Sequence, residues 1–318
     1  MSLLRSVLFL LLITLPVTGA TAIDEMPENT VWYLHADLAQ MRDTDSGRQI
    51  YGWLEGEVFV EINDELGIDL NQEVDTITAF SGADSGTIIV VEGQLSDKMQ
   101  KKLVALATIE GDVSELKHSG STYFHMIDDD YDDEGTDDDD DDHEHRSRTN
   151  NIMIDIEDGA YLSFAVKNKL LVTGNEAQMK ELLDNGGEVA GRESHGDAIF
   201  VLTADKSFVQ AGLKTDEISD DSGDWESNIL RNTEQAALMI SDLGGMIAVE
   251  AKLVSSDAKM ASAIGGIANG LIAMQAFNSE LDPKLQEVIS NTKIEVNDNV
   301  LSVNTVVEPA LVVSILED

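Results

Sequence analysis

The stretch Ile199-Phe200-Val201-Leu202-Thr203-Ala204-Asp205 repeats the apolar pattern of Val31-Trp32-Tyr33-Leu34-His35-Ala36-Asp37, including the closing Ala-Asp. Both runs are rich in β-branched and aromatic residues, which favours a β-strand. Both end at an aspartate that can cap a following helix. We therefore expect a strand followed by a helix at each place. The recurrence indicates that the chain contains an internal duplication.

The elements downstream of each stretch recur in the same order. Apolar runs separated by turn residues predict two hairpins in each copy. The predicted hairpin strands are 74–80 with 87–93 and 161–166 with 170–173 in the first copy, and 236–241 with 246–253 and 293–296 with 300–307 in the second. Because adjacent strands joined by short turns are antiparallel, we predict an α+β fold of two similar halves, each a mostly antiparallel sheet packed with helices.

Helices are predicted between these strands. Apolar residues recur at helical spacing over Ile50–Leu66, and a second helix is expected after Ser96. The second copy carries a helix over Asp257–Phe277 and a closing helix that begins at Pro309, a favoured first-turn residue. Each half therefore has enough helix to cover one face of its sheet.

The first 22 residues are typical of an export signal. Arg5 is the lone charge, an apolar run extends from Val7 to Leu15, and Ala20-Thr21-Ala22 supplies the small residues of a cleavage site. The apolar run is shorter than the roughly 20 residues that span a bilayer, so we expect cleavage rather than an anchor. The predicted location is therefore periplasmic or secreted.

The predicted domains follow from these boundaries. They are a signal peptide at 1–22, a first α+β repeat at 23–190 with an acidic disordered insertion at 128–150, a linker at 191–196, and a second α+β repeat at 197–318.

The composition of the chain limits the kinds of partner that it can bind. The chain has 61 acidic and 20 basic residues, a net charge of -41. Such a charge repels nucleic acid and anionic membrane surfaces and favours divalent cations or basic proteins. Cysteine is absent, so there are no disulfides and no thiolate chemistry. We expect no cofactor and no stable membrane span after signal cleavage.

One segment resembles a known structural unit. Residues 162–175 (LSFAVKNKLLVTGN), which run into 179–183 (MKELL), form a predicted hairpin followed by a helix. This unit resembles one found in uncharacterised families of exported bacterial proteins. The resemblance implies the fold and an exported bacterial setting. It supplies no functional residues, because those families carry no established activity.

The tract Asp128–His145 is the segment best suited to bind an ion. It holds 13 acidic residues and no lysine or arginine. Crowded carboxylates repel one another, and a hard cation such as Ca²⁺ relieves that repulsion, while imidazoles would add ligands for Zn²⁺. The alternative is a disordered, solvated charge block without a selected ligand. The candidate metal ligands are Asp128, Asp130, Asp132, Glu134, Asp137, Asp139, Asp141, His143 and His145.

The tract fits an EF-hand poorly. Acidic residues and Gly135 fall near the expected loop positions, but Asp141 stands where the bidentate glutamate belongs, and neither flank is predicted to be helical. We expect loose, low-affinity cation binding rather than an EF-hand.

Other candidate residues have structural explanations. Asp37 and Asp205 end equivalent strands, where catalytic carboxylates are often found, but helix capping is the simpler role. Ser256 and Lys259 have the Ser-x-x-Lys spacing of penicillin-binding enzymes without their companion motifs, and Ser256 serves equally well as a cap. The helix over Ala258–Phe277 suits close helix contact or a lipid surface, but burial against its own sheet is the preferred interpretation.

No catalytic signature is present. The sequence contains no phosphate-binding glycine loop, no HExxH helix and no dinucleotide fingerprint. We predict an exported, non-catalytic binding or structural protein of the cell envelope. One alternative is divalent-cation binding or buffering through the acidic loop, and another is an envelope hydrolase without an identifiable motif.

Overall fold

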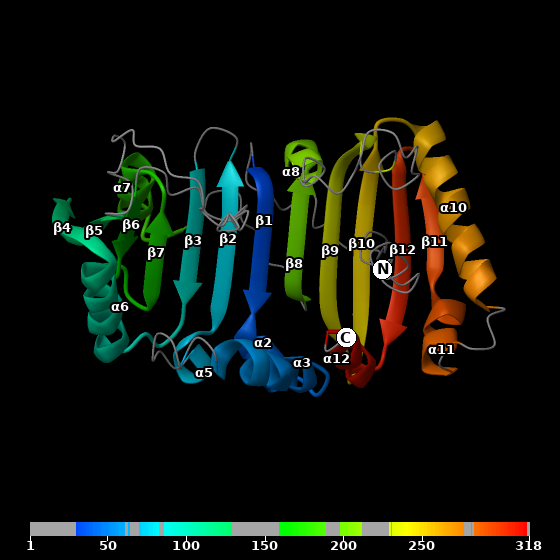
Figure 1. Ribbon diagram of the computed structural model, residues 1–318, viewed down its shortest axis with the longest axis horizontal. Helices are drawn as coiled ribbons and strands as arrows, with labels where there is room; N and C mark the ends of the chain where they lie inside the picture. Colours follow the sequence, from blue (N-terminus) through cyan, green and yellow to red (C-terminus); the bar gives the residue numbers. More distant parts are fainter. Residues whose placement is uncertain are drawn as a thin grey trace, which may run out of the picture.

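One continuous β-sheet runs through the computed structural model, which describes residues 30–60, 63, 70–82, 86–128, 159–188, 198–211, 229, 231–276, 281 and 283–316. The described strands are β1 (Thr30–Asp37), β2 (Thr76–Gly82), β3 (Gly86–Glu92), β4 (Gly111–His118), β5 (Ser121–Asp128), β6 (Ala160–Ser163), β7 (Lys169–Thr173), β8 (Ala198–Asp205), β9 (Thr233–Leu243), β10 (Met246–Ser255), β11 (Lys293–Asn297) and β12 (Val300–Val307). They lie side by side in the order β11-β12-β10-β9-β8-β1-β2-β3-β7-β6-β5-β4, and all described neighbours are antiparallel (Figure 1).

The predicted α+β fold with mostly antiparallel strands is confirmed, but the separation into one sheet per half is wrong. The two quoted stretches form β1 and β8, which pair with each other and place Leu34 opposite Leu202. In two separate sheets, β1 and β8 would both be edge strands with unpaired backbone groups. Their pairing satisfies those groups and joins the two halves into one sheet.

Nine α-helices and one π-helical turn are described alongside the sheet. They are α2 (Leu38–Asp43), α3 (Gly47–Leu54), α5 (Leu70–Glu73), α6 (Asp97–Glu110), α7 (Glu176–Asp184), α8 (Lys206–Ala211), α10 (Ala258–Ala276), α11 (Pro283–Asn291) and α12 (Pro309–Leu316), with the π-turn Glu55–Phe59 after α3. The helices predicted after Ser96, over Asp257–Phe277 and from Pro309 are confirmed as α6, α10 and α12. The Ser96 hydroxyl oxygen caps α6 by accepting from the Met99 backbone N–H at 3.1 Å.

Some predicted boundaries are wrong. The helix expected over Ile50–Leu66 begins at Gly47 and passes into the π-turn, while 61–62 and 64–69 lie outside the described residues. The strand expected at 74–80 begins at Thr76, because the short helix α5 precedes it. The strand expected over 161–166 ends at Ser163, whose hydroxyl oxygen accepts from the Ala165 backbone N–H at 3.1 Å and turns the chain away.

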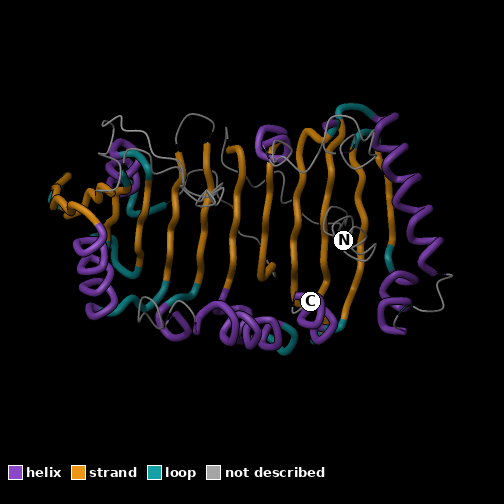
Figure 2. The backbone as a smooth tube through the Cα atoms, in the orientation of Figure 1, coloured by secondary structure: helices purple, strands orange, loops and turns teal. Residues whose placement is uncertain are grey.

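Alternating residues define two faces of the sheet. We call them the Tyr33 face and the Leu34 face, after adjacent residues of β1. On the Tyr33 face, helix α7 seals a core in which Met179 packs against Tyr33, Val90 and Leu171. The other described helices contact the Leu34 face or its margins. Figures 1 and 2 show α6 beside β4 and β5, α8 at one end of the strands, α2, α3 and α12 at the opposite end, and α10 with α11 beside β11.

Arg42 fixes the helices at the lower end of the Leu34 face. Its guanidinium donates to the Val74 carbonyl at 2.9 Å and forms an ion pair with Asp75 at 2.6 Å. It also lies over the ring of Tyr51, 5.4 Å from its centroid. These contacts join α2, α3 and the start of β2, so this border of the face is a fixed part of the fold.

Candidate ligand-binding face of the sheet

A row of apolar side chains crosses the sheet on the Leu34 face. The register places each member directly opposite the next on neighbouring strands. We call it the apolar row; its members, from β5 to β8, are Phe124, Leu162, Val172, Ile89, Ala79, Leu34 and Leu202. Neighbouring strands lie about 4.8 Å apart, so six steps span roughly 29 Å.

The middle of the apolar row is incompletely covered. Val172, Ile89, Ala79, Leu34 and Leu202 are all only partly buried. Beyond Leu202 the same row continues into side chains that are sealed, with exposed fractions of 9% or less at Leu238, Ala251 and Val303. The partly buried part is therefore a strip that crosses five neighbouring strands.

The strip has a buried row on one side and a partly buried row on the other. On one side Trp32 is 6% exposed, and its ring lies 6.2 Å from that of Phe208 on α8. On the other side Ala36 and Ile77 are partly buried and pack against a cluster that contains residues of α2 and α3. The partly buried surface therefore includes both the strip and the row of Ala36.

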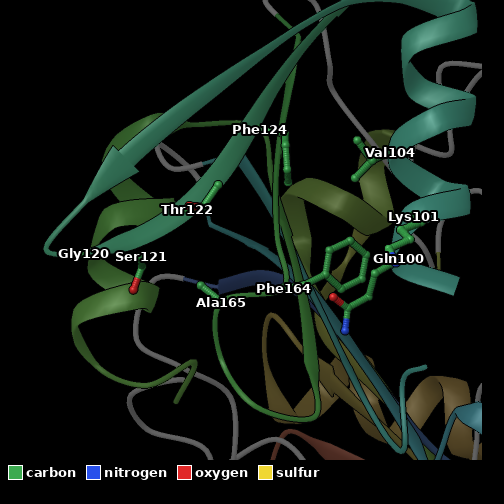
Figure 3. Close-up of a pocket in the computed structure, with 9 residues that line it drawn as sticks. All are labelled: Gln100, Lys101, Val104, Gly120, Ser121, Thr122, Phe124, Phe164 and Ala165. Atoms are coloured by element: carbon green, nitrogen blue, oxygen red, sulfur yellow. The ribbon is translucent and has the colours of Figure 1, made fainter. Parts of the chain in front are cut away.

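A pocket of about 540 Å³ lies at the β5 end of the apolar row. Its apolar part includes Phe124, the first member of the row, together with Val104 of α6 and Phe164 (Figure 3). Polar groups of Gln100, Lys101 and Thr122 line the same pocket. The pocket is therefore lined by apolar side chains together with polar residues and one lysine.

Positive charge is concentrated beside this pocket. Helix α6 carries Lys98, Lys101 and Lys102 near its start, and its two acidic residues, Asp97 and Glu110, are its first and last residues. Lys98 and Lys101 are exposed, and neither forms an ion pair among the described residues. In a chain with a net charge of -41, three lysines within five residues form a local cationic patch.

The Tyr33 face carries a hydrogen-bonded cluster that fastens α7 to β5. The Tyr123 hydroxyl donates to Glu176 Oε1 at 2.6 Å, and Glu176 Oε2 pairs with Lys180 at 3.0 Å. Burial, and then the bond to Glu176, raise the pKa of Tyr123. The bonds from Tyr123 and Lys180 lower the pKa of Glu176. Tyr123 thus remains a neutral donor to a charged carboxylate, which is a structural arrangement.

A second polar contact ties α7 to the turn between β4 and β5. His118 Nε2 lies 2.9 Å from Asp184 Oδ2, and Ser119 Oγ lies 3.4 Å from the same nitrogen. A catalytic Ser-His-Asp triad uses different ring nitrogens for the carboxylate and the hydroxyl. This group is therefore not a triad. The bond to His118 lowers the pKa of Asp184.

The predicted metal ligands lie almost entirely outside the described residues. Asp128 is the last residue of β5, and the other eight candidates, Asp130, Asp132, Glu134, Asp137, Asp139, Asp141, His143 and His145, fall in 129–158. The metal-binding hypothesis for this tract stays a prediction. Within the part of the chain that the structure describes, no group of three or more His, Asp or Glu side chains could hold a metal ion.

The capping roles of the strand-end aspartates are confirmed. Asp37 Oδ1 accepts from the Gln40 backbone N–H at 2.8 Å, and Asp205 Oδ1 accepts from that of Phe208 at 3.0 Å. The capping role suggested for Ser256 is wrong, because Asp257 Oδ1 accepts from the Met260 N–H at 2.8 Å instead. Ser256 Oγ lies 3.4 Å from Asn232 Oδ1.

Helix α10 packs against its own sheet, as the preferred interpretation expected, but only along one side. Ala261, Ile264 and Ala268 face the sheet, where Ile264 packs with residues of β10 and β12. Ile267 and Met274, by contrast, are 39% and 62% exposed. No helix in the described ranges is long and apolar enough to cross a membrane.

The sequence interpretation missed the apolar row, although a signal was present. Adjacent residues in β1 and β3, such as Tyr33-Leu34 and Ile88-Ile89, are apolar toward both faces. A strand that is apolar on both sides is typical of a sheet with both faces covered. On the Leu34 face the described helices cover the margins more completely than the middle.

Comparisons with known proteins give a distant structural likeness. No family model and no curated protein matches the sequence. The chain is similar to the solved structure of TP0453 in crystal form III, at 10% identity and a TM-score of 0.45 over 94% of this chain and 98% of that one. Crystal form IV gives 10% identity and a TM-score of 0.45 over 91% and 93% of the two chains.

Proposed function

We propose that this protein is an exported, non-catalytic binding protein that holds its ligand on the Leu34 face of the sheet. The observation that carries the proposal is the partly buried strip of the apolar row, from Val172 to Leu202. Apolar surface in water costs about 25 cal/mol per Å². A continuous apolar patch bordered by packed helices is typical of a binding surface.

The polar groups support a binding role rather than a catalytic one. Asp37 and Asp205 cap helices. The Tyr123–Glu176 and His118–Asp184 pairs fasten α7 on the opposite face. The side chains with the most suggestive chemistry therefore have structural roles, and none of them lines the pocket at α6.

The exported location rests on residues 1–22, whose charge, apolar run and small residues are those of a signal peptide. A periplasmic or secreted setting also suits a ligand-binding protein without cysteine, because its fold does not depend on the redox state around it.

Internal duplication is part of the same proposal. Read outward from the central pair, the strand order is β1-β2-β3-β7-β6 on one side and β8-β9-β10-β12-β11 on the other. Leu34 and Leu202 hold the same place in the two quoted stretches, and they face each other across the pair. Two copies related by a local two-fold axis would place equivalent residues opposite each other in this way. The unit with the pocket would then be the first repeat, which adds β4 and β5.

Titration of the mature chain, from residue 23 onward, with the uncharged apolar dye Nile red tests the proposal. Ala79→Glu places a carboxylate in the middle of the strip without removing any packed group. The matched control is Val306→Glu, because Val306 is 36% exposed and lies on the Tyr33 face of β12.

We expect wild type and Val306→Glu to bind the dye alike, and Ala79→Glu to bind it at least about tenfold more weakly. Equal binding by a folded Ala79→Glu protein, with wild-type circular dichroism and cooperative unfolding, would overturn the proposal.

A further inference from the structure

We propose that the pocket at α6 is a binding site of its own for a compact aromatic carboxylic acid. The aromatic part of the ligand packs against Phe124 and Phe164, and its carboxylate pairs with Lys101 (Figure 3). The site does not depend on the strip of the apolar row. Three features support it: walls that are already fixed, closure toward the strip, and the single charge in the lining.

Hydrogen bonds hold two walls of the pocket together. Ser163, which is fully buried at the end of β6, donates from its hydroxyl to the Thr122 carbonyl at 2.7 Å and accepts from the Ala165 N–H at 3.1 Å. These two bonds fasten the chain that carries Phe164 to β5. Binding to walls that are already ordered costs less conformational entropy than ordering them at the moment of binding. The pocket is therefore preformed on this side.

Helix α6 forms the remaining wall, and its first turn is fixed as well. The Ser96 hydroxyl accepts from the Met99 N–H at 3.1 Å, and the Ser96 N–H donates to Glu73 Oε2 at 2.9 Å. Met99 is only 5% exposed, so it anchors this turn in the core. The anchored turn positions the pocket residues of the helix, which are Gln100, Lys101 and Val104.

The pocket suits a compact ligand. Its volume of about 540 Å³ lies within the range of roughly 300–1,000 Å³ found for small-molecule sites. Leu162, beside Phe124 in the apolar row, is 6% exposed and closes the row toward the strip. Phe124 and Phe164 are both only partly buried, and both line the pocket. Because aromatic rings pack favourably on one another, a flat ring uses this lining well.

The charge in the lining selects an anion. Lys101 is the one charged residue among the nine that line the pocket. Within the part of the chain that the structure describes, it forms no ion pair. Gln100 and Thr122 add side-chain groups that can donate hydrogen bonds to a carboxylate. A ligand carboxylate would thus give Lys101 a partner.

The charged residues around the pocket do not cancel this preference. Glu115 lies opposite Phe124 on β4, but it forms an ion pair with Lys117 at 3.6 Å. Asp97 and Lys98, at the start of α6, offset each other. The charge of Lys101 therefore remains available to the ligand, whereas most of this acidic protein repels an anion.

Calorimetric titration of the mature chain with 1-naphthylacetate tests the site. Two related compounds separate the parts of the ligand. 1-Naphthylacetamide has the same rings without the charge, and acetate has the charge without the rings. We expect naphthylacetate to bind best, the amide about tenfold more weakly, and acetate at least about 100-fold more weakly. Equal binding of the acid and the amide would overturn the preference for an anion.

Two variants locate the ligand in the pocket. Lys101→Glu should weaken naphthylacetate about tenfold and leave the amide unchanged. The matched control, Lys259→Glu, makes the same change at an exposed site on α10, beside the opposite edge of the sheet, and should bind like wild type. Phe164→Ala should weaken the acid and the amide alike, by about tenfold, with circular dichroism and cooperative unfolding unchanged.

The remaining outcomes separate this site from the strip. If Ala79→Glu weakens naphthylacetate and Lys101→Glu does not, the ligand lies on the strip and the site at α6 is overturned. If naphthylacetate shows no saturable binding below about 5 mM, the site is overturned as well. Neither result changes the proposed function, which depends on the binding of Nile red to the strip.

Discussion

The two faces of the sheet are built by the same strands but differ in how completely their side chains are buried. On β7, Leu171 points to the Tyr33 face and is fully buried under α7, while its neighbour Val172 points to the Leu34 face and is only partly buried. Both side chains are apolar, so composition does not separate them. What separates them is the helix above. Leu171 is therefore part of a core, whereas Val172 keeps some contact with solvent.

Replacing a buried side chain by alanine should give the largest difference in the free energy of unfolding between the two faces. Leu171→Ala removes a side chain with an exposed fraction of 0% from the α7 core and should lower the free energy of unfolding by about 3 kcal/mol. Val172→Ala, one residue along, should cost about 1 kcal/mol, because part of that side chain already contacts solvent. Urea unfolding of the two variants measures both values. Equal losses would mean that the Leu34 face is as tightly packed as the Tyr33 face.

The acidic tract, which lies outside the described residues, tests whether ligand binding belongs to the sheet. We predict that Ca²⁺ or Zn²⁺ raises the melting temperature of the mature protein through the acidic tract. At ten times the dissociation constant the stabilisation would be about 1.4 kcal/mol. A variant lacking 129–145 keeps β5 and should lose the response, while its Nile red binding stays unchanged. A full metal response in that variant would reject the tract as the ion site.

Acid titration should loosen the Tyr33 face before the Leu34 face. The pKa values of Glu176 and Asp184 are lowered in the folded protein by the bonds from Tyr123 and His118. A carboxyl group with a lowered folded pKa contributes stability above its unfolded pKa, and that stability is lost as pH falls through the folded value. The stabilisation should therefore be complete at neutral pH, begin to decline near the ordinary carboxyl pKa of about 4, and disappear only below the lowered folded values.

The double variant Tyr123→Phe/His118→Gln measures this contribution. It should melt at a lower temperature than wild type at pH 7, and the two proteins should converge in acid. A difference in melting temperature that stays constant from pH 7 to pH 3 would show that these bonds do not act through the two carboxylates.

A substitution on the exposed side of helix α10 should have the smallest effect on the free energy of unfolding. Met274 is 62% exposed, so Met274→Lys should change the free energy of unfolding by no more than about 0.5 kcal/mol. Ile264→Lys, on the side that packs against the sheet, serves as the contrast and should be strongly destabilising. A large loss in Met274→Lys would indicate that a further contact covers this side of the helix.

Local signals predicted the strands and caps well. The aspartates after β1 and β8 cap helices because capping depends only on residues within one turn. Strand β4 was missed, since an edge strand with mostly exposed residues has few apolar positions to form a pattern. Helix α11 was missed as well. The pocket at α6 could not be predicted, because its lining comes from α6, the β4–β5 hairpin and the chain after β6.

The sequence by itself determined which segments extend, which residues share a face and where helices begin, because these properties depend on near neighbours and on a repeat of two or of 3.6 residues. Only the tertiary structure decided that β1 and β8 pair, that α7 packs on β6 and β7 on the Tyr33 face and that the middle of the apolar row on the Leu34 face is only partly buried. These depend on contacts between residues far apart in the chain. Periodicity tells which side of a strand is apolar, but only the packed fold decides what covers it.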